Sequence, residues 1–121
     1  MSLDIKLEEA LMKSKTQMRR GVLEMCVLSI IAEEESYPSD IITKLKEVEL
    51  IVVEGTLYPL LSRLKKDGLL QYNWKESTKG PPRKYFQLTT TGTHFLEGLK
   101  ENWAQLVKSV SQSTKKQPNN E

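Results

Sequence analysis

The amino-acid sequence predicts a mainly α-helical protein with one small β-hairpin, an α+β fold. Two observations carry this prediction. Between residues 54 and 66 the apolar side chains recur with the period of an α-helix, and between residues 70 and 88 they recur with a period of two, as in β-strands. A helix that leads directly into a two-stranded hairpin, with another helix before it, is the order of parts in a winged helix-turn-helix.

The clearest helix is expected to begin within residues 54–56. Its apolar residues have the i, i+3, i+4, i+7 spacing of a helix that buries one face: Leu57, Leu60, Leu61 and Leu64. Pro59 places the start of the helix nearby, because a proline is tolerated at low cost only in the first turn. Asp67 and Gly68 predict its end, since glycine adopts the left-handed backbone conformation without a steric penalty.

Two strands are predicted after Gly68. Alternating residues would share one face in each strand: Leu70, Tyr72 and Trp74 in the first, and Lys84, Phe86 and Leu88 in the second. The loop between them, residues 76–82, contains Lys79, a glycine and two prolines. This tip is partly stiffened and able to approach a surface closely, which suits a phosphate backbone or a minor groove. We expect Trp74 to anchor the hairpin to the core.

Three helices are expected before this region. Residues 3–15 form a short amphipathic helix, and residues 21–31, the most apolar segment, form a central core helix. Pro38 begins the third helix, which would be the first half of the helix-turn-helix. Its apolar stripe is Ile41, Ile42, Leu45 and Val48.

The last predicted helix, residues 89–111, has an apolar spacing of 3, 4, 3, 4: Leu96, Leu99, Trp103, Leu106 and Val110. This narrow seam is typical of a coiled coil and implies a partner helix. We expect it to pack, with Leu7 and Leu11, against a second copy of the chain. The alternative is that the helix folds back on its own domain. The domain organisation is therefore a DNA-binding unit over residues 1–88, a dimerisation helix over residues 89–111 and a disordered tail over residues 112–121.

Composition limits the class of protein. A chain of 121 residues with 38% hydrophobic and 28% charged residues is ordinary for one globular domain. The longest apolar run is far shorter than the roughly 18 residues of a membrane span, and residues 1–10 are too charged for a secretory signal. Cys26 is the single cysteine, which excludes an intrachain disulfide and favours a reducing cytoplasm.

Charge is unevenly distributed along the chain. Residues 54–84 carry seven lysines and arginines against three acidic side chains, a net +4, whereas the whole chain has +2 and the remainder therefore −2. A basic segment on a slightly acidic body is the pattern expected of a DNA-contacting surface. The alternative is a solvated face of lysines.

Nine residues are candidate DNA contacts: Tyr37, Ser39, Gly55, Thr56, Tyr58, Arg63, Lys79, Arg83 and Lys84. The first four open two helices, where backbone N–H groups and the helix dipole favour a phosphate. The hairpin cations would hold phosphate or reach the minor groove. Two alternatives stay open: Tyr58 packs against the preceding helix, and Arg63 pairs with a carboxylate such as Asp67.

An enzyme is not expected. His94, the single histidine, stands at the start of a helix, where it is more often solvated or a cap, and Cys26 lies in an apolar segment that would make its thiol inert. Neither a zinc-ligand spacing nor a glycine-rich phosphate loop occurs in the sequence. We therefore expect neither metal nor cofactor.

The motifs of residues 54–92 resemble the PadR family of bacterial winged-helix transcriptional regulators. The matching residues occur in one order: Thr56-Leu57-Tyr58-Pro59, Arg63-Leu64, Asp67-Gly68-Leu69, Trp74, Gly80-Pro81-Pro82-Arg83-Lys84-Tyr85-Phe86, Leu88-Thr89 and Gly92. Arg20-Gly21 and Leu23-Glu24 also resemble the first core helix of that family, so the likeness covers about residues 18–99. The single helix after the hairpin resembles the small branch of the family, which dimerises through its terminal helices.

The resemblance implies a cytoplasmic homodimer that binds a roughly palindromic promoter and represses it until a small molecule binds. It also implies that Trp103 lines the dimer interface and stacks on a planar aromatic ligand, a role that a large apolar indole suits. Three alternatives remain: Trp103 only fills the seam, the repressor has no effector, or the winged helix docks proteins instead of DNA.

Overall fold

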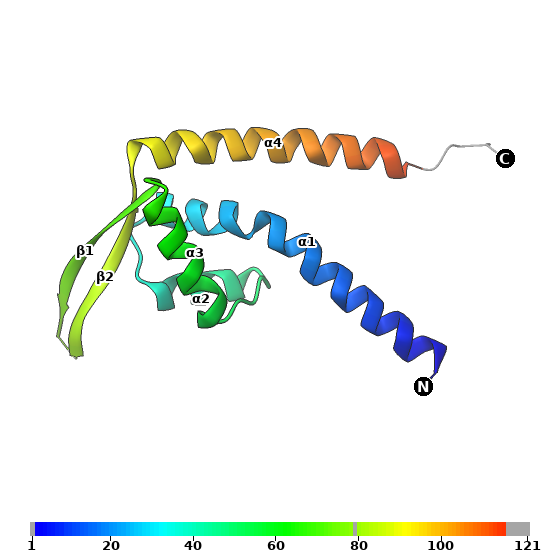
Figure 1. Cartoon of the computed structure of the whole chain (residues 1–121), viewed down its shortest axis with the longest axis horizontal. Helices are drawn as coiled ribbons and strands as arrows, with labels where there is room; N and C mark the ends of the chain where they lie inside the picture. The colour runs from blue at the N-terminus through cyan, green and yellow to red at the C-terminus, as the bar shows by residue number, and fades with distance from the viewer. Residues whose placement is uncertain (1, 79, 116–121) are drawn as a thin grey trace.

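The computed structural model describes residues 2–78 and 80–115. Within them the order of elements is α1 (Leu3–Glu33), α2 (Pro38–Glu47), α3 (Glu54–Lys66), β1 (Leu70–Ser77), β2 (Gly80–Leu88) and α4 (Thr90–Thr114). The hairpin of β1 and β2 extends from one end of the molecule, beside α2 and α3 (Figure 1). Helices α1 and α4 leave this region in the opposite direction and diverge toward the two termini. The predicted α+β winged helix-turn-helix is confirmed.

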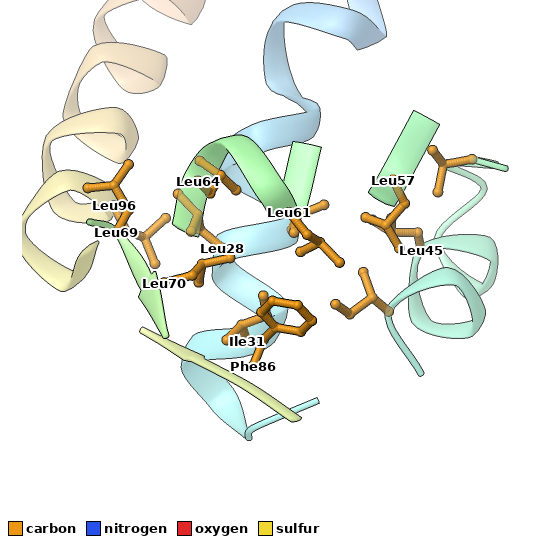
Figure 2. Close-up of a cluster of buried hydrophobic side chains, with 13 residues drawn as sticks. Leu28, Ile31, Leu45, Leu57, Leu61, Leu64, Leu69, Leu70, Phe86 and Leu96 are labelled. Carbon is orange, nitrogen blue, oxygen red and sulfur yellow. The ribbon is translucent and has the colours of Figure 1, made fainter. Parts of the chain in front are cut away.

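One core holds these elements together. It consists of thirteen buried apolar residues contributed by all four helices, the hairpin and the linkers on either side of α3: Val27, Leu28, Ile31, Ile41, Leu45, Val52, Leu57, Leu61, Leu64, Leu69, Leu70, Phe86 and Leu96. Figure 2 shows α3 leucines facing α1 on one side and Leu45 of α2 on the other. Each fully buried leucine contributes on the order of 1.5–3 kcal/mol. The leucine stripe predicted for residues 57–64 is therefore the centre of the fold, with Leu60 partly buried at its edge.

The prediction of two separate helices before residue 32 was wrong, because α1 is one continuous helix of 31 residues. Residues 16–20 contain no helix breaker, and a single Gly21 costs a helix only about 1 kcal/mol. The Ser2 side chain caps the first turn by accepting a hydrogen bond from the Ile5 N–H at 3.2 Å. Only the last seven residues of α1, from Val27 onward, include buried side chains.

Helix α2 begins at Pro38 as predicted, but its apolar stripe is one residue shorter than predicted. Ile41 and Leu45 are buried and Ile42 is partly buried. Val48, in contrast, is 64% exposed. The helix ends at Glu47, and Val48 has already left the helical conformation (φ −105°, ψ 19°), so its side chain no longer continues the stripe.

Helix α3 begins at Glu54 and ends at Lys66, close to its predicted bounds. Asp67 is the C-cap, and Gly68 has a φ of 80°, the left-handed conformation expected of it. Pro59 lies inside the helix, in its second turn, rather than in the first turn. Its ring is exposed, so the missing backbone N–H removes a helical hydrogen bond only on the solvent side.

The hairpin is longer and its turn tighter than predicted. The expected loop over residues 76–82 is largely strand, because β1 continues to Ser77 and β2 begins at Gly80. The register pairs Leu70 with Leu88 and Tyr72 with Phe86, and it shifts between Lys75 and Ser77. A bulged tip tolerates the two prolines of β2, since fewer regular ladder bonds are needed there. Lys79 lies outside the described residues.

The linker between α1 and α2 pairs with the outer edge of β2. The Ser36 N–H donates to the Phe86 carbonyl at 3.2 Å, and the Phe86 N–H donates to the Ser36 carbonyl at 2.8 Å. Ser36 is buried, and its hydroxyl donates to the Glu34 carbonyl at 2.8 Å. The hairpin is therefore tied to the helical body at mid-strand while its tip projects away (Figure 1).

Helix α4 is joined to the end of α3 through Thr89 and Gly92. The Thr89 hydroxyl donates to the Gly68 carbonyl at 2.7 Å and accepts from the Gly92 N–H at 2.9 Å, which caps α4. The helix then continues to Thr114, so the prediction that the tail is disordered from residue 112 was wrong for residues 112–114. Residues 116–121 of that predicted tail lie outside the described part. Within the described residues, no helix is both long and apolar enough to cross a membrane.

Candidate nucleic-acid interface

A groove of about 460 Å³ runs between the helix-turn-helix and the hairpin. It is lined by residues of α2, α3, β1 and β2 and of the α1–α2 linker: Tyr37, Pro38, Ser39, Tyr58, Leu61, Ser62, Lys65, Tyr72, Trp74, Pro82, Arg83, Lys84 and Phe86. Five predicted DNA contacts meet here: Tyr37, Ser39, Tyr58, Arg83 and Lys84. Among its described lining residues the groove has three cationic side chains and no carboxylate. Its electrostatic character therefore suits an anion.

Aromatic rings hold the lysines of this groove in place. The Lys84 ammonium lies 4.5 Å from the centroid of the Tyr72 ring and 5.4 Å from that of Trp74. From α3, the Lys65 ammonium lies 5.3 Å from the same Tyr72 ring. Each cation–π contact contributes about 0.5–1 kcal/mol at an exposed site. The rings carry no net charge and do not neutralise the lysines, so the groove stays positively charged.

The opposite face of the hairpin has its own stack of rings and cations. The Arg83 guanidinium carbon lies 4.5 Å from the Tyr37 ring centroid, and Tyr37 meets Tyr85 edge-on with 5.2 Å between centroids. The Lys75 ammonium lies 5.0 Å from the Tyr85 ring. Tyr37 therefore contacts a cation of the β1–β2 hairpin, the wing, through its ring. Its position in the sequence did not indicate this role.

Lys75 differs from the other wing cations because it is paired with Glu35. Gln87 also donates to the Glu35 carboxylate, at 3.0 Å. The hydrogen bond from Lys75, followed by that from Gln87, lowers the pKa of the Glu35 carboxyl below its ordinary value. Lys75 is thus used to fasten the wing to the linker, and its charge is largely compensated.

Three predicted contacts lie elsewhere. Thr56 lines a separate hollow with Arg19, Arg20 and Leu23 of α1, and Gly55 is exposed beside it in the first turn of α3. The Arg63 guanidinium donates to Glu24 of α1 at 2.7 Å and lies 3.5 Å from Asp67. The structure therefore bears out the alternative for Arg63, pairing with carboxylates, and moves this residue away from the groove.

Sequence reasoning did not assign a DNA contact to eight of the thirteen described lining residues, among them Ser62, Lys65, Tyr72 and Pro82. A signal for two of them existed, because Tyr58, Ser62 and Lys65 have the i, i+4, i+7 spacing of one helix face. The prediction for Trp74 was wrong. Its indole is 61% exposed and is not among the side chains that pack against the core, although it lines the groove together with Leu61 and Phe86.

A second groove, of about 630 Å³, lies between α1 and α4. Its lining is mostly apolar and includes Trp103, which is 44% exposed: Met18, Arg19, Gly21, Val22, Met25, Leu99, Asn102, Trp103, Leu106, Val107, Val110 and Ser111. Leu7 and Leu11 are exposed on α1, beyond this groove. Leu99 is half-buried against the core, whereas Leu106 and Val110 are exposed.

The predicted interface seam on α4 was wrong for one residue, Leu96. Leu96 is only 4% exposed because it packs in the core of its own chain, so it is removed from the expected interface. The first turns of α4 therefore fold back on the domain, and the later turns carry the exposed seam.

The two residues considered for catalysis lie on different helices, Cys26 on α1 and His94 on α4. His94 is exposed on α4, and burial raises the pKa of the half-buried Cys26 thiol. In the described ranges no group of three or more histidine, cysteine, aspartate or glutamate side chains is placed to hold a metal ion.

Known proteins are similar to this chain in both sequence and fold. Residues 27–98 match the model of the transcriptional regulator PadR-like family. A PadR-like transcription factor from Bacteroides fragilis is 55% identical, with a TM-score of 0.71, over 84% of this chain and 99% of that one. A PadR-like transcriptional regulator from Bacillus cereus is 39% identical over the same shares, with a TM-score of 0.76.

The structural likeness extends beyond the matched family region. A PadR family transcriptional regulator from Eggerthella lenta is 28% identical, with a TM-score of 0.87, over 93% of this chain and 99% of that one. Such coverage includes the terminal helices as well as the winged domain. The family match over more than half of the chain, together with these neighbours, makes this protein a transcriptional regulator of the PadR-like family.

Proposed function

We propose that this regulator binds duplex DNA as a homodimer and represses a nearby promoter. Each subunit would place the exposed side of α3 in the major groove, while Arg83 and Lys84 of the wing hold adjacent phosphates or reach the minor groove. The observation that carries the proposal is the groove between α3 and the wing, which gathers Lys65, Arg83 and Lys84 without a carboxylate among its described lining residues. A protein-docking surface would not need this one-sided charge.

Dimerisation through the terminal helices is part of the proposal. The first half of α1 is exposed along its whole length and carries Leu3, Leu7 and Leu11 at intervals of four residues, an apolar stripe with no partner in the described part of the chain. Leu106 and Val110 continue the apolar surface on α4. A second copy that covers both stripes would bury them and set the separation of the two α3 helices. Two half-sites would then lie about one helical turn, roughly 34 Å, apart. In this arrangement residues 1–88 read DNA, with residues 3–15 also contributing to the dimer, and residues 89–111 form the dimerisation helix.

An effector would act at the groove between α1 and α4. Trp103 offers a large apolar face there, and the pair of indoles in a symmetric dimer would accept a planar aromatic compound. Such a ligand relieves repression only if it binds a dimer with wrongly spaced α3 helices better than the DNA-competent dimer. A cytoplasmic location fits this role.

The test is fluorescence anisotropy with the protein's own promoter region and a scrambled duplex, titrated over salt. The proposal expects tight, sequence-selective binding whose logarithmic affinity falls linearly with the logarithm of salt concentration. Weak and equal binding to both duplexes would contradict it and favour a protein-docking module. Selective binding that no planar aromatic compound weakens would support a repressor without an effector.

A further inference from the structure

Trp74 is the largest exposed aromatic side chain of the wing. With 61% of its surface exposed, the indole covers no part of the core, although burying it would contribute more than burying most other side chains. Its only ring contact among the described residues is edge-on with Tyr72, with 6.2 Å between centroids and an interplanar angle of 90°. Hairpin stability alone therefore does not account for a tryptophan at this position.

The surroundings of Trp74 identify the kind of partner that fits it. Trp74 lines the groove between α3 and the wing, opposite Lys84 in the β1–β2 register, and the Lys84 ammonium lies 5.4 Å from its ring. Lys65 and Arg83 line the same groove. An apolar surface flanked by cations complements a nucleic-acid strand, whose sugars are apolar and whose phosphates are anionic. A neutral apolar partner would leave these cations without compensation.

The position of Trp74 along the hairpin indicates which part of the DNA it would contact. Trp74 pairs with Lys84 halfway along the hairpin, two residues farther from the end of α3 along β1 than Tyr72, whose ring Lys65 contacts. If α3 occupies the major groove, the tip of the wing reaches across the phosphate backbone toward the neighbouring minor groove. The indole would then meet the deoxyribose wall of that groove, beside phosphates held by Lys84.

We propose that Trp74 is a direct DNA contact of the wing, packing its indole against the sugars at the edge of the minor groove next to the phosphates bound by Lys84. This inference rests on the proposed DNA binding and deepens it by adding an apolar contact to an electrostatic one. The contact is sensitive to groove width, because an inserted ring requires a matching separation of the two sugar walls.

The direct test uses the Trp103→Phe variant, in which Trp74 is the single tryptophan of the chain. Acrylamide quenches the exposed indole of the free protein. Adding the promoter duplex should reduce the quenching constant at least twofold and shift the emission. Quenching that stays unchanged at saturating duplex would overturn the inference, because the indole would then remain in solvent in the complex.

Affinity measurements separate a direct contact from a positioning role. Trp74→Ala should weaken promoter binding about tenfold, equivalent to about 1.4 kcal/mol, while the salt slope stays unchanged because no cation is lost. Trp74→Phe should retain most of the affinity, since an apolar ring remains. A salt slope that falls by about one unit in Trp74→Ala would mean that Trp74 only positions Lys84, and would overturn direct contact.

Asn73→Ala is the matched control. Asn73 precedes Trp74, is exposed, and points to the other face of β1 because side chains alternate along a strand. It should bind DNA as the unmodified protein does. Binding by Trp74→Ala that equals this control would contradict the proposal. If the unmodified protein binds no duplex, the proposed function fails and this inference falls with it, whereas full DNA binding with an accessible Trp74 overturns this inference alone.

Discussion

The guanidinium of Arg83 lies over the ring of Tyr37, with 4.5 Å between the guanidinium carbon and the ring centroid. Tyr37 occupies the N-cap position of α2. The contact therefore links the wing to the helix-turn-helix, the two parts of the proposed DNA surface. Tyr37 therefore has two possible functions at this surface. Its ring can hold the guanidinium of Arg83, and its hydroxyl can contact a phosphate.

We expect Tyr37→Phe to bind the promoter with unchanged affinity, and Tyr37→Leu to bind about two- to fivefold more weakly. Phenylalanine keeps the ring beneath Arg83, whereas leucine removes the cation–π contact, which contributes about 0.5–1 kcal/mol at an exposed site, and leaves Arg83 less ordered. Anisotropy titrations measure both affinities. A large loss in Tyr37→Phe would instead show that the hydroxyl contacts a phosphate.

Gly92→Ala should destabilise the fold by about 1–3 kcal/mol or more. Gly92 is buried, and a Cβ at this position would overlap the carbonyl oxygen of Leu69 and lie 3.0 Å from its carbonyl carbon. Backbone on both sides leaves no flexible atom to move away. Urea denaturation gives the free energy of unfolding, and an unchanged midpoint would contradict the expected overlap.

Gly98→Ala is the control within the same helix. A Cβ at Gly98 would meet nothing within 4 Å, and alanine favours a helix interior over glycine by about 1 kcal/mol. This variant should therefore be as stable as the unmodified protein or slightly more stable.

The Glu35→Gln variant should lose stability at pH values above the ordinary carboxyl pKa of 4.5, and progressively less below that value. Lys75 and Gln87 lower the pKa of the folded-state carboxyl below its ordinary value of 4.5. The contribution of Glu35 is therefore fully present above that value and is lost as the pH falls through the lower, folded-state pKa. Melting temperatures of the two proteins should differ at pH 7 and converge below pH 4.5. Glu101→Gln, which changes the same charge on the exposed side of α4, should give no such pH-dependent difference.

Replacement of Lys65 and of Arg63 by alanine should affect DNA binding differently, although both residues are cations of α3. Lys65 lines the groove, so Lys65→Ala should lower the salt slope by up to about one unit. Arg63 is paired with Glu24 and Asp67, so Arg63→Ala should leave the slope nearly unchanged and cost about 0.2–1 kcal/mol of stability for each exposed pair. An unchanged slope in Lys65→Ala would remove this side of the groove from the DNA interface, whereas an equal fall in both variants would add Arg63 to that interface.

Leu11→Glu should weaken dimerisation without unfolding the domain. Leu11 is 60% exposed in the single chain, so the winged domain does not depend on it, but a second copy covering this stripe would have to bury the new carboxylate. Sedimentation velocity measures the dimer fraction, and thermal denaturation at low concentration checks the fold. Glu9→Ala, on the opposite side of α1 by the helical period, should dimerise normally. An unaltered dimer in Leu11→Glu would exclude the N-terminal stripe from the interface.

The sequence by itself determined the type and order of the elements from Pro38 to Leu88, because each has a strong local signal. Leucine spacing, a proline near a helix start and a glycine at a helix end each act through a few neighbouring residues, and the structure agrees with them at α2, α3 and Gly68. The same local signals identified Arg83, Lys84 and Tyr58 as candidate contacts, and all three line the groove.

Only the tertiary structure decided which side chains meet. Arg63 and Lys65 are indistinguishable cations in the sequence, but the packing of α3 against α1 turns Arg63 toward Glu24 and leaves Lys65 beside Tyr72. Leu96 has the spacing of an intermolecular seam and is buried in its own core, while Trp74 has the pattern of an anchor and is exposed on the wing. The burial and contacts of these side chains depend on segments that are distant in the chain. The periodicity of a sequence specifies which residues share a face of a helix or strand, but not which segment packs against that face.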